Sequence, residues 1–416
     1  MHWPALLAVL QTQREGGMQR PVREAITIAM LCALGGDAVH GFQPGGVCLT
    51  MNRQRAAIRR SGPSPVMLGD LLRGRPRQVQ FGELKVSEMG IGTWSWGNQL
   101  LWGYEESMDP EIQAVFDLCV DRGITLFDTG DSYGTGKLNG QAEKLLGKFM
   151  KDYAARNGGK RPYIGTKFAT YPWRLSAESL VAACQESAER LQRPVDVGQI
   201  HWPAASYAPW QERALWDGLA KMYNEGYVSA VGLSNYGPKQ LRKVHSYLSA
   251  KGVPIAANQI QYSLLSRKVG DEVKEVCDEL GICMIAYSPL GLGILGGRYM
   301  PGSSQPAPPG FRGLILKQRI QEAAPLLSVL ADVAEQRGKT VAQVSINWCI
   351  CKGTVPIPGA RTLQQAQENL GAMGWRLSQA EVQALDAAAD LVPRELVQVH
   401  RVVRFCTETA SACERG

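Results

Sequence analysis

Short apolar segments that fit strands alternate with helix-like segments along most of this chain, and this alternation limits the possible folds more than any other feature. Eight apolar segments bounded by turn residues are predicted as strands: 88–94, 125–128, 163–167, 195–201, 228–234, 254–261, 283–288 and 354–358. Helical spacing predicts helices at 110–121, 141–155, 177–191, 210–224, 239–250, 272–280, 324–336, 341–349 and 363–372. Short apolar strands that are mostly followed by helices indicate a parallel sheet covered by helices.

This order predicts an α/β fold, and two architectures fit it. Eight strand–helix units that close on themselves form a (β/α)8 TIM barrel, and the chain has the length for one. A doubly wound open sheet is the alternative. Residues 79–86 predict an N-terminal β-hairpin around Gly82 that would plug the bottom of the barrel. We predict an extended, disordered targeting arm over 1–78, the barrel over 79–391 and a tail over 392–416.

The charge of the chain is concentrated in the predicted arm. Residues 1–80 hold ten Arg, no Lys and four acids, which gives +6 of the total charge of +7. An apolar stretch at 25–34 follows basic residues as in a signal peptide, and the Arg-rich, acid-free run at 53–60 is typical of a transit peptide. A signal followed by a transit segment, with Phe42 between them, resembles the bipartite leader of plastid proteins. A cleaved leader to the plastid (chloroplast) is predicted, with another organelle, the cytoplasm or a plain extension as alternatives.

The rest of the chain is nearly neutral, with 35 bases against 34 acids. A neutral body argues against nucleic-acid binding, which needs a cationic face. The body has no run of 18 apolar residues, so a stable membrane insertion is not predicted. The ten Cys are scattered without a CxxC pair, so neither a disulfide framework nor a metal site is predicted.

A polar residue ends most of the predicted strands. The six residues are Asp128, Lys167, His201, Ser234, Gln259 and Tyr287, spaced 39, 34, 33, 25 and 28 residues apart. Each spacing is close to the length of one strand–helix unit. Barrel enzymes assemble their sites at the carboxyl ends of the strands, so these side chains are expected to surround one site.

Three of these residues, together with Tyr133, suit proton transfer to a carbonyl group. The hydroxyl of Tyr133 titrates near ~10, and an ammonium such as Lys167 within reach would lower that pKa. Asp128 would keep Lys167 charged and fixed, and His201 would orient the carbonyl or share its proton. No side chain supplies a hydride, so a nicotinamide cofactor is required.

Several segments resemble the signatures of the aldo-keto reductases. They are Phe127-Asp-Thr-Gly-Asp-Ser-Tyr-Gly134, Gly165-Thr-Lys167, Gln199-Ile-His-Trp-Pro203, Gly232-Leu-Ser-Asn-Tyr236, Asn258-Gln259, Ala286-Tyr-Ser-Pro-Leu-Gly291 and Pro356-Ile-Pro-Gly-Ala-Arg361. The resemblance spans about residues 79–390, in order. The sequence around these segments is similar to the plastid-type members of that superfamily in plants and algae.

This resemblance implies a role for each matching residue. Tyr133 would be the general acid, Lys167 its pKa modulator, Asp128 the partner of Lys167, and His201 the group that orients the substrate. The implied cofactor is NADPH (NADP), and the implied contacts are Ser234, Asn235, Gln259, Tyr287, Ser288, Pro289, Leu290, Gly291, Arg361, Gln365, Glu368 and Asn369. Among these, Ser234, Asn235 and Gln259 would hydrogen-bond the carboxamide, Tyr287 would stack on the ring, and Arg361 would bind the 2′-phosphate.

Aromatic residues in the expected barrel-end loops suggest an apolar mouth for the substrate. Trp94, Trp96 and Trp202 are the predicted pocket residues. A small-molecule aldehyde or ketone is expected, and pyridoxal and lipid-derived aldehydes both fit. Two alternatives to an NADP-dependent oxidoreductase remain: an NADP(H)-sensing regulatory subunit of the same fold, and a barrel without catalysis.

The segment Gly291-Leu-Gly-Ile-Leu-Gly296 matches the GxGxxG pattern of Rossmann dinucleotide sites. The context does not fit, because the segment follows the seventh strand and a Pro- and Gly-rich insert comes next. We interpret it as a loop near the cofactor pyrophosphate that acts as a lid.

Overall fold

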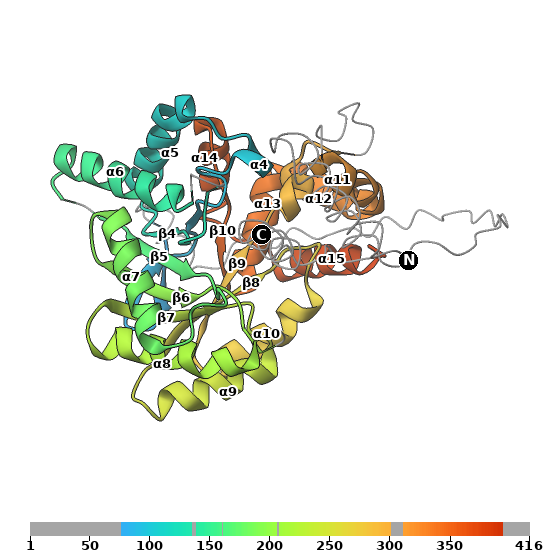
Figure 1. Ribbon diagram of the computed structural model, residues 1–416. Coiled ribbons are helices and arrows are strands. Elements are labelled where there is room, and N and C mark those ends of the chain that lie inside the picture. The colour runs from blue at the N-terminus through green and yellow to red at the C-terminus, as the bar shows by residue number, and fades with distance from the viewer. Residues whose placement is uncertain (1–75, 135–138, 160, 206–207, 301–310, 394–416) are drawn as a thin grey trace, which may run out of the picture. The chain divides into compact units, whose positions relative to one another are not determined.

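Eight parallel strands in chain order form the centre of the computed structural model (Figure 1). They are β3 (Ile91–Gly92), β4 (Leu126–Asp128), β5 (Tyr163–Phe168), β6 (Val195–Ile200), β7 (Val228–Ser234), β8 (Ile255–Gln261), β9 (Cys283–Tyr287) and β10 (Val355–Ile357). The structure describes residues 76–134, 139–159, 161–205, 208–300 and 311–393. The predicted arm, apart from residues 76–78, and the predicted tail from residue 394 onward lie outside these ranges.

The first and last strands meet, which makes the sheet a barrel. The backbone N–H of Gly92 in β3 donates to the carbonyl oxygen of Pro358 at 3.2 Å, just beyond β10. Gly92 also forms a parallel bridge with Gly359. Glycine is needed at 92 because an added Cβ would lie 2.9 Å from the carbonyl oxygen of Ile357. The predicted TIM barrel is therefore confirmed, and the open-sheet alternative is not found.

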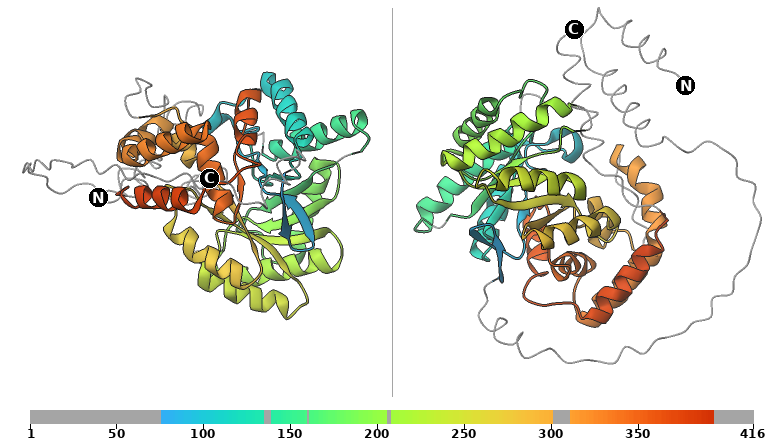
Figure 2. Two further views of the ribbon diagram at one scale, coloured as in Figure 1. Left: turned by 180° about the vertical axis from the view of Figure 1, so that it is seen from behind. Right: turned by 90° about the horizontal axis from the view of Figure 1, so that it is seen from below.

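Helices lie outside the strands (Figures 1 and 2). Between β3 and β9, consecutive strands are connected by α5 (Asp109–Asp121), α6 (Gln141–Arg156), α7 (Ala177–Leu191), α8 (Glu212–Asn224), α9 (Pro238–Ser249) and α10 (Lys268–Glu279). The remaining α-helices are α4 (Gln99–Trp102), α11 (Phe311–Glu322), α12 (Ala324–Arg337), α13 (Val341–Cys351), α14 (Leu363–Leu370) and α15 (Gln379–Asp390). Three 3₁₀ helices are described: η1 (Glu106–Met108), η3 (Pro209–Gln211) and η4 (Gly291–Gly296).

Side-chain caps fix where several helices begin. Ser176 accepts a hydrogen bond from the N–H of Ser179 at the start of α7, and Ser179 reciprocates. Thr340 forms the same capping box at α13, and Ser378 forms it at α15. Each box satisfies backbone N–H groups that a helix start leaves without partners. The local sequence therefore sets the first residue of these helices.

The hairpin of β1 (Gln78–Phe81) and β2 (Leu84–Ser87) fills the N-terminal end of the barrel. It turns at Gly82, whose φ of +58° favours glycine. Phe81 and Val86 are fully buried. They belong to a cluster with residues near the beginnings of the barrel strands, including Leu126, Val197, Ala230, Ala257 and Val355. The predicted hairpin plug is confirmed.

Some elements differ from the prediction. Helices α11 and α15 were not predicted. The first follows a Pro- and Gly-rich stretch, and the second buries mainly Ala, which gives a weak apolar signal. Strand β3 has two residues instead of seven, and α10 begins at Lys268 rather than at 272. Tertiary pairing, rather than local apolarity, decides these boundaries.

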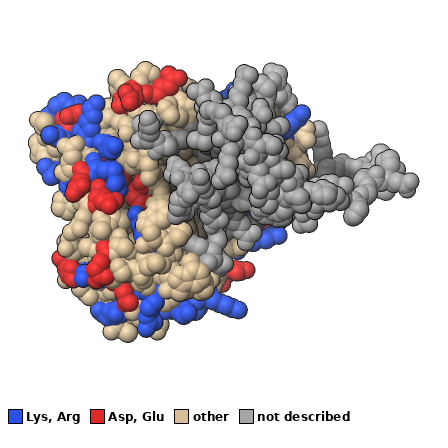
Figure 3. All heavy atoms as spheres, viewed as in Figure 1, with Lys and Arg blue, Asp and Glu red and all other residues tan. Residues whose placement is uncertain are grey.

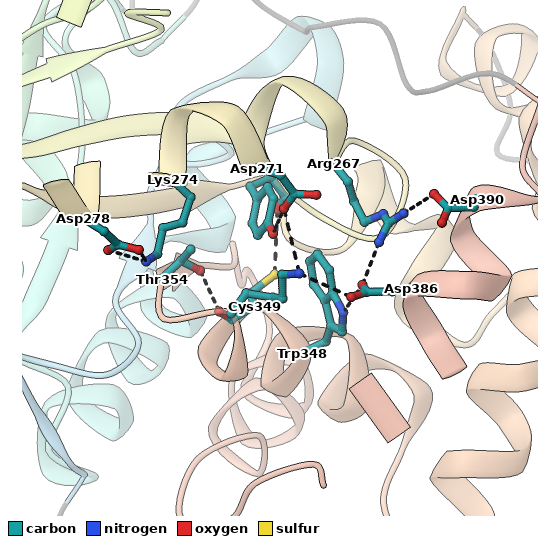
Figure 4. A network of polar contacts seen from close by, with 11 residues as sticks. Arg267, Asp271, Lys274, Asp278, Trp348, Cys349, Thr354, Asp386 and Asp390 are labelled. Atoms are coloured by element: carbon teal, nitrogen blue, oxygen red, sulfur yellow. Dashed lines mark hydrogen bonds and ion pairs between the residues drawn. The ribbon is translucent and has the colours of Figure 1, made fainter. Parts of the chain in front are cut away.

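A polar network ties α15 to the wall of the barrel (Figure 4). Arg267, just before α10, lies 2.7 Å from Asp386 and also pairs with Asp390, both in α15. The indole N–H of Trp348 in α13 donates to Asp386 at 3.0 Å, and Lys352 approaches the same carboxylate at 3.3 Å. Three helices that are distant in sequence are thus joined around one carboxylate.

The surface of the described residues carries both signs of charge. On the face shown in Figure 3, Lys and Arg side chains are interspersed with Asp and Glu. Within the described ranges, none of the helices combines the length and apolarity needed to cross a membrane.

Candidate active site

The six polar residues predicted at the strand ends all lie at the carboxyl end of the barrel. Asp128 ends β4, Ser234 ends β7 and Tyr287 ends β9, while His201 directly follows β6. Lys167 and Gln259 are the penultimate residue of β5 and the third-last residue of β8. The strand register places Ser234 opposite Gln259, and it places Lys167 opposite Gln199 of the neighbouring strand.

Asp128 is the hub of a buried polar layer. Its Oδ2 accepts a hydrogen bond from Lys167 Nζ at 2.5 Å, and its Oδ1 accepts from Gln259 at 2.6 Å and from Gln199 at 3.3 Å. Lys167 Nζ also donates to the carbonyl oxygen of Thr129 at 2.6 Å. Lys167 is only 1% exposed. A buried ammonium needs such partners, so one carboxylate fixes the position of Lys167.

Tyr133 and His201 lie partly exposed above this layer. Lys167 Nζ is 4.8 Å from the centre of the Tyr133 ring, and the centres of the Tyr133 and His201 rings are 5.7 Å apart. The Tyr133 ring packs against Gly130, where an added Cβ would lie 3.2 Å from the ring. The structure therefore brings the four predicted catalytic residues together.

The electrostatics of Tyr133 differ in direction from the sequence expectation. Removal from solvent raises the pKa of the Tyr133 hydroxyl well above its usual 10.0, and the charges of Asp128, Tyr287 and Asp131 add to the effect. Burial also lowers the pKa of Lys167, against the opposing attraction of Asp128, Asp131 and Glu143. The sequence pattern indicates the ammonium of Lys167, but only the fold shows the desolvation of Tyr133. In this geometry Tyr133 carries its proton at neutral pH.

The residues predicted to bind the nicotinamide form one connected group. The amide nitrogen of Asn235 donates to the carbonyl oxygen of His201 at 3.1 Å and to Ser234 Oγ at 3.0 Å. The Tyr287 hydroxyl donates to Asn235 Oδ1 at 3.0 Å, and Ser234 Oγ donates to the carbonyl oxygen of Gln259 at 3.1 Å. These bonds hold the Tyr287 ring and the strand-end amides beside the catalytic residues.

The predicted cofactor segment after β9 is a tight turn. The segment Ser288, Pro289, Leu290 and Gly291 has positive φ at Ser288 (52°) and at Gly291 (53°). The N–H of Gly291 donates to the carbonyl oxygen of Ser288 at 2.9 Å. The turn continues into η4, so the GxGxxG segment includes a short 3₁₀ helix rather than the start of an α-helix.

The predicted phosphate-binding residues lie just before α14 and along it. Arg361 is half-buried. Its guanidinium lies 5.6 Å from the centre of the Trp102 ring and donates a hydrogen bond to the Trp102 carbonyl oxygen. Burial lowers its pKa, and within the described ranges no carboxylate forms an ion pair with it. A desolvated cation without a counter-anion fits a phosphate group.

The other three residues of this predicted set have structural contacts. The side chain of Gln365 accepts a hydrogen bond from the N–H of Arg361 at 2.9 Å, and Glu368 offers its backbone oxygen to Gln343. The amide of buried Asn369 donates to the Gly359 carbonyl oxygen at 3.3 Å. The backbone of Arg361 is thus held by Gln365 of the helix that follows it.

The three predicted pocket tryptophans have different positions. Trp202 is 8% exposed, with its ring centre 4.2 Å from that of His201. Trp94 is partly exposed and packs edge-on against Trp102. Trp96 is fully buried, and its indole N–H donates to the Ala360 carbonyl oxygen at 2.8 Å. Trp96 therefore packs as a core residue and, contrary to the prediction, does not line the substrate pocket.

Sequence reasoning missed several polar residues behind the site. Gln199 lies within a recognised motif, but only the fold shows that it binds Asp128. Asp131 and Arg174 form an ion pair with a separation of 2.7 Å, and both side chains are under 10% exposed. Charged residues in loops gave no periodic signal that could have identified this pair.

In the described part of the chain, no group of three or more His, Cys, Asp or Glu could hold a metal ion.

A family model matches most of the barrel. Residues 88–390 match the model described as the aldo/keto reductase family, which confirms the resemblance drawn from the motifs. The chloroplastic pyridoxal reductase of Arabidopsis thaliana is 53% identical over 325 residues, which cover 77% of this chain and 88% of that protein.

Two solved structures share the fold at lower identity. A glycerol dehydrogenase from Gluconobacter oxydans is 20% identical with a TM-score of 0.64, over 77% of this chain and 97% of that one. An aldo/keto reductase from Klebsiella pneumoniae, solved with NADP and acetate, is 24% identical with a TM-score of 0.59, over 78% and 98%. Barrel, strand-end residues and family match agree: the chain belongs to the aldo/keto reductase family.

Proposed function

We propose that this protein is an NADPH-dependent oxidoreductase that reduces an aldehyde or ketone to the alcohol, with Tyr133 as the proton donor. The observation that carries the proposal is the buried Asp128–Lys167 pair beneath the Tyr133 ring, with His201 beside it. NADP(H) is the cofactor of aldo/keto reductases, in agreement with the sequence prediction.

The protein side chains hold and deliver one proton. Tyr133 is protonated at neutral pH, as a tyrosine with its usual pKa already is and as one with a raised pKa remains, and this is the form that a proton donor needs. Lys167, fixed by Asp128, faces the tyrosine ring and stabilises the phenolate that remains after transfer. His201, whose ring centre is 5.7 Å from that of Tyr133, would orient the carbonyl oxygen toward the hydroxyl.

A second group of residues would hold NADPH, which supplies the hydride when bound. Ser234, Asn235 and Gln259 present amide and hydroxyl groups that suit the carboxamide, and the Tyr287 ring suits stacking on the nicotinamide. Arg361 suits the 2′-phosphate, since it is a half-buried cation beside the start of α14.

Pyridoxal is the first substrate to test, and the plastid is the proposed compartment. Both rest on the chloroplastic pyridoxal reductase to which this chain is similar and on the leader pattern of residues 1–78. Pyridoxal is a planar aldehyde, which suits stacking against aromatic rings such as Trp202, whose ring lies beside His201.

The test compares the wild-type protein with Tyr133→Phe in the oxidation of NADPH by pyridoxal and a panel of aldehydes. We expect the substitution to lower kcat by about 10²–10⁴-fold, because it removes the proton donor. Tyr153→Phe is the matched control, since Tyr153 is a buried tyrosine whose hydroxyl binds Asp121 in the helical layer. That control should retain the wild-type rate.

Equal rates in wild type and Tyr133→Phe would contradict the assignment of the proton donor. Tight NADPH binding without turnover of any carbonyl would instead favour the cofactor-sensing alternative.

A further inference from the structure

A second buried ion pair lies next to the catalytic residues. Asp131, two residues before Tyr133, lies 2.7 Å from the guanidinium of Arg174. The two side chains are 3% and 8% exposed. Removing two charges from water costs desolvation free energy. An ion pair buried this deeply is therefore expected to do more than keep the surface of the protein solvated.

Asp131 fixes the loop that carries Tyr133. Its backbone N–H donates to the carbonyl oxygen of Lys167 at 2.9 Å, and its Oδ1 accepts from the N–H of Ala169 at 3.1 Å. The N–H of Tyr133 donates to the carbonyl oxygen of Gly130 at 3.0 Å. The segment from Asp128 to Tyr133 is therefore fastened along the end of β5, next to Lys167.

Arg174 is fastened in turn to the loops after β5 and β6. Its guanidinium donates to the Ala169 carbonyl oxygen and lies 5.0 Å from the centre of the Tyr171 ring. The side chain of Gln211 donates to the carbonyl oxygen of Arg174 at 2.9 Å. The ion pair therefore joins the loop after β4 to the loop after β5, and the Gln211 hydrogen bond to the Arg174 backbone adds the segment after β6.

The pair also belongs to the set of charges around the Tyr133 hydroxyl. The titratable groups that face Tyr133 are Asp128, Asp131, Lys167, His201 and Tyr287. Behind Lys167, the buried carboxylate of Glu143 accepts a hydrogen bond from Arg190 at 2.6 Å. Three buried carboxylates are thus matched by three cations: Lys167, Arg174 and Arg190.

We propose that Asp131 and Arg174 are positioning residues that hold Tyr133 in place and balance the charge around its hydroxyl. The proposal rests on the proposed role of Tyr133 as proton donor. The negative charge of Asp131 opposes ionisation of the hydroxyl. Because Arg174 lies 2.7 Å from that carboxylate, its positive charge is expected to offset part of the effect.

The two partners therefore have opposite electrostatic effects on Tyr133. Asp131→Asn removes the negative charge of Asp131 and leaves Arg174 unpaired, so the Tyr133 phenolate becomes easier to form. Arg174→Gln leaves Asp131 unpaired, so the phenolate becomes harder to form. A purely structural role predicts a loss of stability in both variants and no such opposition.

The experiment measures the pH dependence of kcat/KM for alcohol oxidation with NADP⁺, which requires ionised Tyr133. We expect the pH of half-maximal kcat/KM to fall by about one unit in Asp131→Asn and to rise by about one unit in Arg174→Gln. The double variant should return toward the wild-type midpoint while kcat stays about 10–100-fold low, because Tyr133 is displaced. Arg174→Lys should keep the wild-type midpoint.

Arg376→Gln is the matched control, since it leaves the buried carboxylate of Glu88, just before β3 at the opposite end of the barrel, without its half-buried Arg376 partner. It should lower the melting temperature without moving the midpoint. Unmoved midpoints in both single variants, or shifts in the same direction, overturn the proposal. Tyr133→Phe is measured in parallel: if it stays active, the proposed function fails, and if it is inactive while the midpoints do not move, only the present inference fails.

Discussion

At the residue scale, a single carboxylate organises the candidate site. Asp128 binds side chains from β5, β6 and β8, so its two oxygens connect half of the barrel's strands in one layer. Space for this layer comes from glycine: an added Cβ on Gly232 would lie 2.9 Å from Gln199 Cγ. The residue type at Gly232, which carries no charge, is therefore as tightly constrained as the residue types at Asp128 and Lys167.

Arg361→Gln tests the proposed recognition of the 2′-phosphate. Loss of a charged hydrogen-bonding partner worth about 1.5–3 kcal/mol should raise the KM for NADPH by about 10–100-fold. The KM for NADH should change by less than about twofold, because NADH lacks the phosphate that the guanidinium would bind. Steady-state kinetics with both cofactors measure the two values.

Arg337→Gln serves as the control for this prediction, because Arg337 pairs with Glu381 between α12 and α15. It should leave both KM values unchanged. Equal increases for NADPH and NADH in Arg361→Gln would show that Arg361 supports the fold of the segment and not the phosphate.

At the element scale, the chain's pattern predicts all eight barrel strands and the hairpin. The patterns that succeed are local: apolar runs for strands, helical spacing for α7, and Gly82 for the turn. The patterns that fail depend on partners far along the chain. The fold determines that Trp96 packs in the core rather than beside the substrate, and that Asp131 meets Arg174.

Phe81→Ala tests the role of the hairpin as the plug of the barrel. Because Phe81 is fully buried among strand residues, its truncation should lower the free energy of unfolding by about 3–5 kcal/mol. Denaturant titration measures the change. Lys85→Ala, at an exposed position of β2, is the control and should have little effect. An unchanged midpoint in Phe81→Ala would mean that the hairpin does not contribute to the core.

At the scale of the whole molecule, the charge of the chain divides between two parts. Residues 1–80 account for +6 of +7, and the remaining residues are almost neutral. This division supports the proposal that the basic arm is an address rather than a binding surface of the enzyme.

A reporter fusion tests that address. Residues 1–75 fused to a fluorescent protein should direct it to the plastid of a photosynthetic eukaryotic cell, and the imported fusion should be shorter on a gel. The same reporter fused to residues 76–416 should stay in the cytosol. Retention of the first fusion outside plastids would contradict the proposed localisation.

The position of the hairpin has a practical consequence for such processing. The chain enters the barrel at the end where β1 and β2 lie, whereas Tyr133 and its neighbours lie at the carboxyl ends of the strands. Pro76 therefore lies at the pole of the barrel opposite the chemistry, and a chain end or an affinity tag placed at Pro76 would begin there. Ragged trimming upstream of the hairpin would yield a mixture of chain lengths with one and the same catalytic rate.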